Sequence, residues 1–333
     1  MKRVFVTGHK GYIGVHLVDL LKAQGHYVAG CDLNLFEGCE WEPCVSTDVE
    51  YLKDFRDLTI DELKGYDSIM HLAAISNDPM GDLDPEVTYG INREGTKALA
   101  EKARAAGIPQ FLFSSSCSIY GKGDKLDIDE SGTTAPLTAY ASSKIAAEEH
   151  LKKISDASFK SVCLRNATAY GHSAMLRIDL VVNNLLACGL SRGDIRVMSD
   201  GSPWRPLIHC KDIARAFIAF LNYETNNPFI VVNVGSNSEN YQVRDVVNAI
   251  QSKIPQANVV YTGEVGADPR NYRVNFDKLS QLLPDFQLEY NLEKGVNELH
   301  EKLRKYGFKL TDFDGDQFVR LRTLKKRLSK ITG

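Results

Sequence analysis

This chain lacks the features that mark several common classes of protein. Its seven cysteines are scattered, with no CxxC pair and no histidines at metal-ligand spacing, so we expect reduced thiols and no metal. No apolar run is long enough to cross a bilayer, and no signal-peptide pattern opens the sequence, which makes the cytoplasm the expected compartment. A formal net charge of -3 gives no general attraction for nucleic acid or an anionic membrane. Any anionic ligand must then be held by individual arginines.

Internal repeats and low-complexity linkers are also missing. The 333 residues, 43% of them hydrophobic and 25% charged, are enough for one large or two medium folded units with a substantial core. The sequence therefore describes an ordinary globular chain, and its function must be read from local motifs.

The clearest local motif is VTGHKGYIG at residues 6–14, which contains Gly8, Gly11 and Gly14. Glycine tolerates positive φ and lets a ligand come close to the backbone. Three glycines at the entrance to a helix therefore indicate a turn shaped around a ligand. A glycine-rich turn without a ligand is the alternative, since a triple-glycine pattern alone is weak evidence.

The flanks of this motif favour a ligand. Residues 3–6 predict a buried strand, apolar residues at helical spacing predict a helix that ends near Gly25, and residues 27–32 predict a second strand that ends at Asp32. Strand, glycine turn, helix, strand and terminal acid form the dinucleotide-binding unit, with the pyrophosphate at the helix N-terminus. Asp32 can accept hydrogen bonds from the adenosine ribose and would repel a 2′-phosphate, so we expect NAD rather than NADP.

Strands and helices continue to alternate along the chain. This alternation predicts an α/β fold, a Rossmann-type doubly wound parallel sheet with helices on both faces. After about residue 170 the regularity weakens, which predicts a smaller C-terminal α/β substrate domain. We expect an NAD-binding domain over 1–169, with returning segments near 206–235, and an interleaved substrate-binding domain over 170–333. The expected strands are 68–74, 110–116, 161–167 and 229–235, and the expected helices are 92–107 and 142–153.

Tyr140 and Lys144, in the stretch YASSK, are four residues apart and so share one face of a helix. A phenol beside an ammonium has its anionic form stabilised, which suits a general base. Such a spacing alone is common on helices. Here it follows a polar cluster, FSSSCSIYG at 113–121, at the carboxyl end of a predicted strand, where open α/β sheets bind ligands.

Taken together, these motifs resemble the extended short-chain dehydrogenase/reductase family, whose members modify nucleotide-activated sugars. The resemblance covers nearly the whole chain. It rests on VTGHKGYIG, Asp32, KDFRD with Asp54 and Phe55, HLAA at 71–74, INREGT with Asn92, the serine cluster and YASSK.

The resemblance implies a role for each matching residue. Ser116 would hydrogen-bond the reacting sugar hydroxyl, Tyr140 would take its proton, and Lys144 would also hold the nicotinamide ribose. The implied cofactor-binding residues are Gly8, Lys10, Gly11, Tyr12, Ile13, Gly14, Asp32, Asp54, Phe55, Leu72, Ala73, Ala74, Asn92, Ser114, Tyr140 and Lys144. The implied substrate-binding residues are Ser76, Ser116, Cys117, Ser118, Thr168, Arg177, Asp179, Asn183, Arg205 and Arg270.

Departures from the family pattern narrow the reaction. Sugar 4,6-dehydratases of this family carry an Asp-Glu pair where this chain has Cys117 and Ser118, so elimination of water is not expected. Thr168 replaces the usual asparagine. Arg205 and Arg270 match positions that grip a diphosphate, for which the planar guanidinium is suited. Surface salt-bridging is the alternative role for Arg177 and Asp179.

We therefore expect an NAD-dependent oxidoreductase or epimerase that oxidises C4 of a UDP-, dTDP- or GDP-linked sugar, as a nucleotide-sugar 4-epimerase or 4-dehydrogenase. A 4-keto nucleotide-sugar reductase and a non-catalytic dinucleotide sensor are the alternatives. The family resemblance also implies a homodimer. We expect the basic tail at 320–333 to form a solvated helix.

Overall fold

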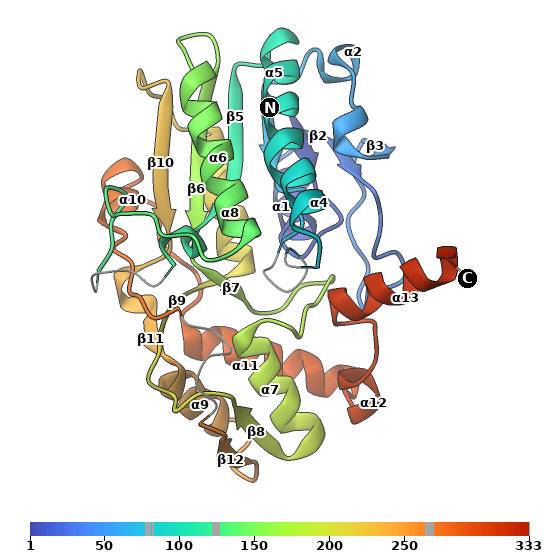
Figure 1. The fold of residues 1–333 in the computed structure, drawn as a ribbon, viewed down its shortest axis with the longest axis vertical. Helices are drawn as coiled ribbons and strands as arrows, with labels where there is room; N and C mark the ends of the chain where they lie inside the picture. Colours follow the sequence, from blue (N-terminus) through green and yellow to red (C-terminus); the bar gives the residue numbers. More distant parts are fainter. Residues whose placement is uncertain (77–80, 82, 122–126, 264–269, 333) are drawn as a thin grey trace.

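A computed structural model describes residues 1–76, 81, 83–121, 127–263 and 270–332, with side chains as far as residue 327 (Figure 1). Its centre is a seven-stranded sheet in the order β10-β6-β5-β4-β1-β2-β3, and every neighbouring pair is parallel. This confirms the predicted Rossmann-type sheet. The strands are β1 (Arg3–Thr7), β2 (Tyr27–Asp32), β3 (Val49–Leu52), β4 (Ser68–His71), β5 (Gln110–Ser116), β6 (Lys160–Asn166) and β10 (Phe229–Val234).

Helices cover both faces of this sheet, because alternate residues of each strand point to opposite sides. On β1, Val4 and Val6 pack into a core with α1 and α8, whereas Phe5 packs into a second core with α5 and α6. Figure 1 shows α5 and α6 crossing in front of the strands. The elements associated with the sheet are α1 (Gly14–Ala23), η1 (Phe55–Asp57), α2 (Ile60–Leu63), α4 (Pro85–Thr88), η2 (Tyr89–Gly95), α5 (Thr96–Ala105), η3 (Cys117–Tyr120), α6 (Ala139–Ile154), α8 (Cys210–Leu221) and α10 (Asp277–Leu282).

A further core lies beyond the carboxyl edge of the sheet, in the lower part of Figure 1. It holds a three-stranded sheet, β11-β9-β7, and a strand pair, β12-β8. Its strands are β7 (Thr168–Tyr170), β8 (Asp194–Val197), β9 (Trp204–His209), β11 (Asn240–Gln242) and β12 (Asn258–Tyr261). Its helices are α7 (Val181–Arg192), η4 (Asn237–Glu239), α9 (Val243–Gln251), α11 (Leu292–Tyr306), α12 (Leu310–Phe313) and α13 (Arg320–Thr332).

The strands predicted at 27–32 and 110–116 are confirmed with the same bounds. The predicted strand 68–74 ends earlier, at His71, and the helix predicted from residue 92 begins inside a π-helical segment, η2. The sequence analysis did not anticipate β3. The domain boundary near residue 169 stays a prediction, although β10 does return to the main sheet as its edge strand.

All seven cysteines are free thiols, and only Cys44 is exposed. In the described part of the chain, no helix has both the length and the apolar character needed to cross a bilayer.

Candidate active site

A cavity of about 980 Å³ opens where the strands of the main sheet end. Its walls come from the segments that follow β1, β2, β4, β5 and β6, from α6, and from the elements beyond the sheet. Of the predicted site residues, the cavity is lined by Gly8, Lys10, Gly11, Tyr12, Ile13, Gly14, Asp32, Asp54, Phe55, Leu72, Ala73, Ala74, Ser76, Ser114, Ser116, Cys117, Ser118, Tyr140, Lys144, Thr168, Arg177, Asp179, Arg205 and Arg270. Residues predicted from distant motifs therefore meet in one space.

The glycine turn is packed too tightly for side chains. Gly8 has a φ of +75°, and a Cβ on it would lie 2.7 Å from the backbone nitrogen of Ala73. A Cβ on Gly14 would lie 2.1 Å from the carbonyl oxygen of Gly8. Both distances are shorter than real Cβ contacts, so glycine is required at both positions. The turn consequently brings bare backbone to the cavity at the start of α1, where a phosphate can approach the N–H groups.

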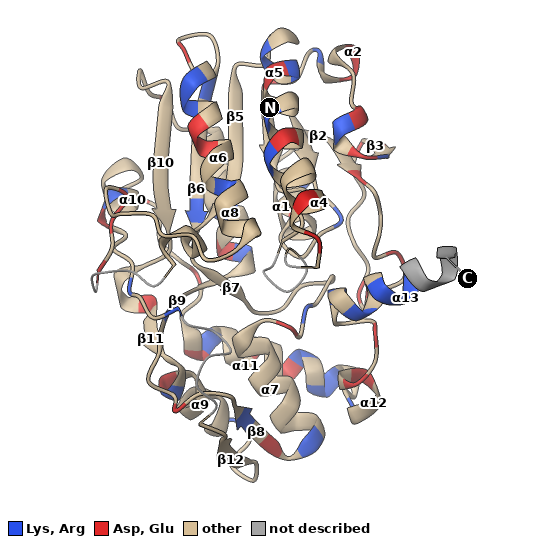
Figure 2. Ribbon diagram, viewed as in Figure 1, with Lys and Arg blue, Asp and Glu red and all other residues tan. Residues whose placement is uncertain are grey.

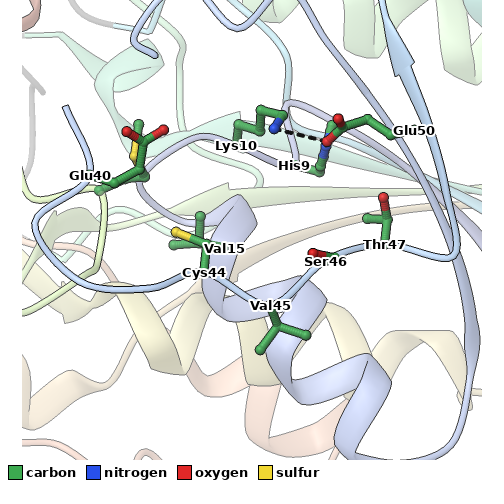
Figure 3. Close-up of a pocket in the computed structure, with 10 residues that line it drawn as sticks. His9, Lys10, Val15, Glu40, Cys44, Val45, Ser46, Thr47 and Glu50 are labelled. Carbon is green, nitrogen blue, oxygen red and sulfur yellow. Dashed lines mark hydrogen bonds and ion pairs between the residues drawn. The ribbon is translucent and has the colours of Figure 1, made fainter. Parts of the chain in front are cut away.

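Asp32 is held at the rim of this turn by two backbone donors. Its carboxylate accepts hydrogen bonds from the backbone N–H of Lys10, at 3.2 Å, and of Asn34, at 2.8 Å. The side chain of Lys10 instead pairs with Glu50, at 2.9 Å. Figure 3 shows Lys10 and His9 both reaching Glu50 in a smaller pocket, of about 100 Å³, beside the turn. The ammonium of Lys10, which could otherwise pair with a 2′-phosphate, is thus engaged by Glu50. The carboxylate of Asp32 remains in the cavity wall.

Lys144 is 3% exposed and sits between β5 and the side chain of Tyr140. Its Nζ donates a hydrogen bond to the carbonyl oxygen of Ser114 at 2.7 Å and lies 5.6 Å from the centre of the Tyr140 ring. Burial lowers the pKa of Lys144 to about 7, and the Glu148 carboxylate opposes this effect. Helix α6 therefore places the Lys144 ammonium, a group that is costly to bury, directly beside the phenol of Tyr140 in the cavity wall.

A buried ion pair supports this wall from behind. The guanidinium of Arg165, on β6, donates to Glu148, on α6, at 2.7 Å, and the hydroxyl of Ser115 donates to the same carboxylate at 2.5 Å. Glu148 follows Lys144 by one helical turn. The pair therefore ties α6 to the ends of β5 and β6. Sequence reasoning missed both residues, although the helical spacing from Lys144 was a usable signal.

The residues that replace the dehydratase acids are poor proton donors. The Cys117 thiol is 1% exposed and donates to the carbonyl oxygen of Arg165 at 3.1 Å, and burial raises its pKa. Ser116 accepts a hydrogen bond from the backbone N–H of Ser118 at 3.1 Å, which caps η3. Within the described residues, the hydroxyl of Ser118 is buried without a hydrogen-bond partner.

Arg177 and Asp179 form a two-pronged ion pair in the cavity wall, with nitrogen–oxygen distances of 3.0 and 2.7 Å. Arg177 also donates to the hydroxyl of Ser76 at 3.2 Å, and its side chain is only 8% exposed. This pair is therefore not the solvated surface bridge that was its alternative role.

Two predicted residues do not line the cavity. Asn92 is 1% exposed, and its side chain bonds the backbone N–H and carbonyl of Ile75 at 2.8 and 3.0 Å. Asn183 is fully buried and bonds the backbone of Gly171 and Arg177. Both hold cavity-lining segments in place, and the neighbouring Asn184 reaches the cavity instead. Their assignment as direct ligand contacts stays a prediction.

Arg205 and Arg270 meet on the far side of the cavity. Arg205, on β9, is 8% exposed and donates to the carbonyl oxygen of Arg270 at 2.5 Å. This contact joins the β9 strand to the loop that carries Arg270. Two arginines predicted from separate motifs therefore share one wall.

The sequence analysis was wrong about the start of the basic tail. The tail does form a helix, α13, but Arg320 at its first position is 4% exposed and lines the cavity. Phe318 is fully buried just before it, and the backbone N–H of Ile178 bonds the carbonyl of Phe318 at 3.0 Å. The burial of Phe318 therefore keeps the start of α13 in the protein interior, away from solvent.

The arrangement fits a dinucleotide. The glycine turn is free of side chains at the helix start, Asp32 stands beyond it, and Tyr140 and Lys144 lie in the same cavity. Among the described residues, no group of three or more His, Cys, Asp or Glu side chains is placed to hold a metal ion. With Tyr140 and Lys144 in the cavity wall, this arrangement allows proton transfer by side chains next to a bound organic cofactor.

Comparisons with known proteins agree with this geometry. Residues 4–235 match the model of the NAD dependent epimerase/dehydratase family. A UDP-glucose 4-epimerase of Rhizobium meliloti is 29% identical over 319 residues, which cover 88% of this chain and 96% of that protein. The structure of MoeE5 in complex with UDP-glucuronic acid and NAD is similar with a TM-score of 0.79 at 26% identity, over 91% of this chain and 99% of that one. TunA, an NAD dependent NDP-hexosamine 5,6-dehydratase, shares the fold with a TM-score of 0.82 at 24% identity, over 92% and 98% of the two chains.

Proposed function

Because this chain belongs to the NAD dependent epimerase/dehydratase family, we propose that it is an NAD-dependent nucleotide-sugar 4-epimerase. The observation that carries the proposal is the placement of Tyr140 and Lys144 in one cavity with Ser116 and the glycine turn. NAD supplies a hydride acceptor that can also return the hydride. The chain itself supplies binding, orientation and proton transfer.

Three side chains divide the proton chemistry. The phenolate form of Tyr140 takes the proton from the C4 hydroxyl, which favours loss of hydride from the same carbon. The ammonium of Lys144, held by the carbonyl of Ser114 at 2.7 Å, stabilises that phenolate. The hydroxyl of Ser116 orients the sugar oxygen. In the reverse direction Tyr140 returns the proton.

Each end of the cavity binds one of the two ligands. The glycine turn and Asp32 receive the dinucleotide, and Arg205 and Arg270 receive the diphosphate of the nucleotide sugar. A 4-epimerase rather than a 4-dehydrogenase is supported by the Rhizobium meliloti relative, which is named as a UDP-glucose 4-epimerase and covers 88% of this chain. We therefore infer a UDP-linked hexose as the substrate.

Incubation of the purified chain with UDP-glucose tests this proposal. Proton NMR should show UDP-galactose forming with no net consumption of NAD, and Tyr140→Phe should slow its formation by about 10²-fold or more. Net reduction of NAD with release of a ketone would instead make the chain a dehydrogenase. Binding of NAD without turnover of any UDP-, dTDP- or GDP-sugar would support the sensor alternative.

We also propose a cytoplasmic location and a homodimer. The location is supported by six buried cysteines that remain free thiols, as in a reducing compartment. The homodimer rests on the family resemblance of the sequence. Light scattering of the full chain separates a monomer from a dimer.

A further inference from the structure

Arg320 is a buried cation at the edge of the cofactor end of the cavity. One of its terminal nitrogens, Nη2, donates to the carbonyl oxygen of Met175 at 2.9 Å, and its guanidinium lies 4.5 Å from the ring centre of Phe36. The other terminal nitrogen, Nη1, is buried with no hydrogen-bond partner among the described residues. A guanidinium has five N–H donors, so this side chain retains capacity for an acceptor in the cavity.

The charges around Arg320 do not balance. Burial lowers the pKa of Arg320, and the nearby positive charge of Arg177 lowers it further. Two groups offset this effect in part, the thiol of Cys39 and the carboxylate of Asp179, but that carboxylate already receives two hydrogen bonds from Arg177. Two buried cations thus share one anion. A buried charge without its own partner is expensive, and an anionic ligand would remove that cost.

The neighbours of Arg320 pack near the start of α1. Phe36 and Met175 belong to a small apolar cluster with Val15, in the first turn of α1, and both Phe36 and Met175 also line the cavity. Phe36 follows Asp32 in the segment after β2. Arg205 and Arg270 instead come from β9 and the loop after β12. The anion nearest to Arg320 should therefore be the one bound at the start of α1.

We propose that Arg320 binds the diphosphate of the dinucleotide and that α13 thereby acts as a C-terminal strap over the cofactor. This inference rests on the proposed function, since it requires NAD in the cavity. Figure 1 shows α13 beginning below the carboxyl edge of the sheet and running outward to the C-terminus, and in Figure 2 the blue of Lys and Arg marks several positions along the start of its ribbon. In this arrangement α13, the last helix of the chain, holds a ligand that is bound at the first ligand-binding turn.

The test is calorimetric titration of the nucleotide-free full chain with NAD, ADP-ribose, adenosine and UDP. Arg320→Met retains an apolar stem and removes the charge. We expect this variant to bind NAD and ADP-ribose about tenfold more weakly or worse, as for loss of a charged hydrogen bond, and to bind adenosine and UDP with unchanged affinity. Arg322→Met is the matched control, because Arg322 is exposed on the same helix and donates to the carbonyls of Phe313 and Gly315. It should bind all four ligands like the parent chain.

Thermal unfolding separates ligand binding from a structural role. Because Arg320→Met removes a poorly compensated buried charge, the ligand-free variant should unfold at the same temperature as the parent or higher, while ADP-ribose stabilises it less. Arg320→Lys, which retains a cation, should bind ADP-ribose more tightly than Arg320→Met. If Arg320→Met does not fold, Arg320→Lys is compared with the parent chain instead. Weaker binding of ADP-ribose by this variant, with unchanged binding of adenosine and UDP, then supports the inference.

Three outcomes would overturn the inference. Unchanged affinity for ADP-ribose in the folded variants would do so, as would an equal loss of adenosine binding, which indicates damaged packing. Weaker UDP binding with normal ADP-ribose binding would assign Arg320 to the diphosphate of the sugar nucleotide. Failure of the parent chain itself to bind NAD would overturn the proposed function first.

Discussion

The ammonium nitrogen of Lys144 lies 5.6 Å from the ring centre of Tyr140, one turn earlier on α6, and both side chains line the cavity. Lys144 is anchored by its hydrogen bond to the carbonyl of Ser114, on the adjoining strand. The distance between the two side chains is therefore set by the packing of α6 against β5, and it does not depend on a mobile loop.

This geometry predicts that Tyr140→Phe lowers turnover by about 10²-fold or more, since a positioned general base contributes roughly 10²–10⁴. Only a hydroxyl is removed, so folding and NAD binding should stay near those of the parent chain. Steady-state kinetics with UDP-glucose measures the loss. Tyr261→Phe serves as the control, because Tyr261 is 44% exposed on β12. Near-normal turnover of Tyr140→Phe would remove Tyr140 from the mechanism.

Lys144 should also make stability depend on pH. Its pKa is lowered in the native state from 10.5 to about 7, so between these pH values the unfolded chain binds more protons and the free energy of unfolding rises with pH. One such group contributes at most about 1.4 kcal/mol per pH unit. Lys144→Met lacks this term, so its stability advantage over the ligand-free parent should shrink as pH rises from 7 towards 10.

Urea unfolding at pH 7, 8 and 9 measures this difference. Lys305→Met is the surface control, because Lys305 is exposed near the end of α11. A stability difference between Lys144→Met and the parent that stays constant across this range would show that Lys144 is charged in the native state throughout.

Asp32 should enforce selectivity for NAD. Its carboxylate is oriented by the backbone N–H groups of Lys10 and Asn34, so a 2′-phosphate on the ribose would face a like charge. Asp32→Ser should therefore weaken the binding of NAD and strengthen the binding of NADP. Calorimetric titration with both cofactors measures the ratio. Equal affinity of the parent chain for NAD and NADP would end the role given to Asp32.

Gly14→Ala should disrupt the glycine turn, because the added Cβ would lie 2.1 Å from the carbonyl oxygen of Gly8. Overpacking of this kind costs about 1–3 kcal/mol, and here it also displaces the backbone that receives the phosphate. We expect a lower midpoint in urea unfolding and weaker NAD binding. Gly90→Ala is the matched control, since a Cβ there meets nothing within 4 Å. Normal NAD binding by Gly14→Ala would show that the turn can adapt.

The sequence predicted the sheet and the cofactor end of the cavity because their signals are local. β1 and β2 are mostly apolar and buried on both faces, and the glycine turn lies between these two signals. β3 was missed because Val49–Leu52 is half exposed and lacks that signal. Arg320 was missed for a different reason. Its burial depends on the anchoring of Phe318 in a core formed by distant segments, which the basic sequence around it conceals.

The last prediction concerns the product, and it rests on Cys117 and Ser118. Elimination of water from a sugar requires an acid that protonates the departing hydroxyl. The Cys117 thiol is buried against the carbonyl of Arg165, and burial raises its pKa, while a serine hydroxyl is not an acid at neutral pH. The similarity of the fold to a 5,6-dehydratase does not supply the missing group, because function depends on the site. We therefore expect UDP-, dTDP- and GDP-hexoses to yield a C4 epimer or a 4-keto sugar that retains its C6 hydroxyl. Carbon NMR of the products, with and without added NAD, distinguishes these two outcomes. A 4-keto-6-deoxy sugar would show that water had been eliminated and that another residue of the cavity acts as the acid.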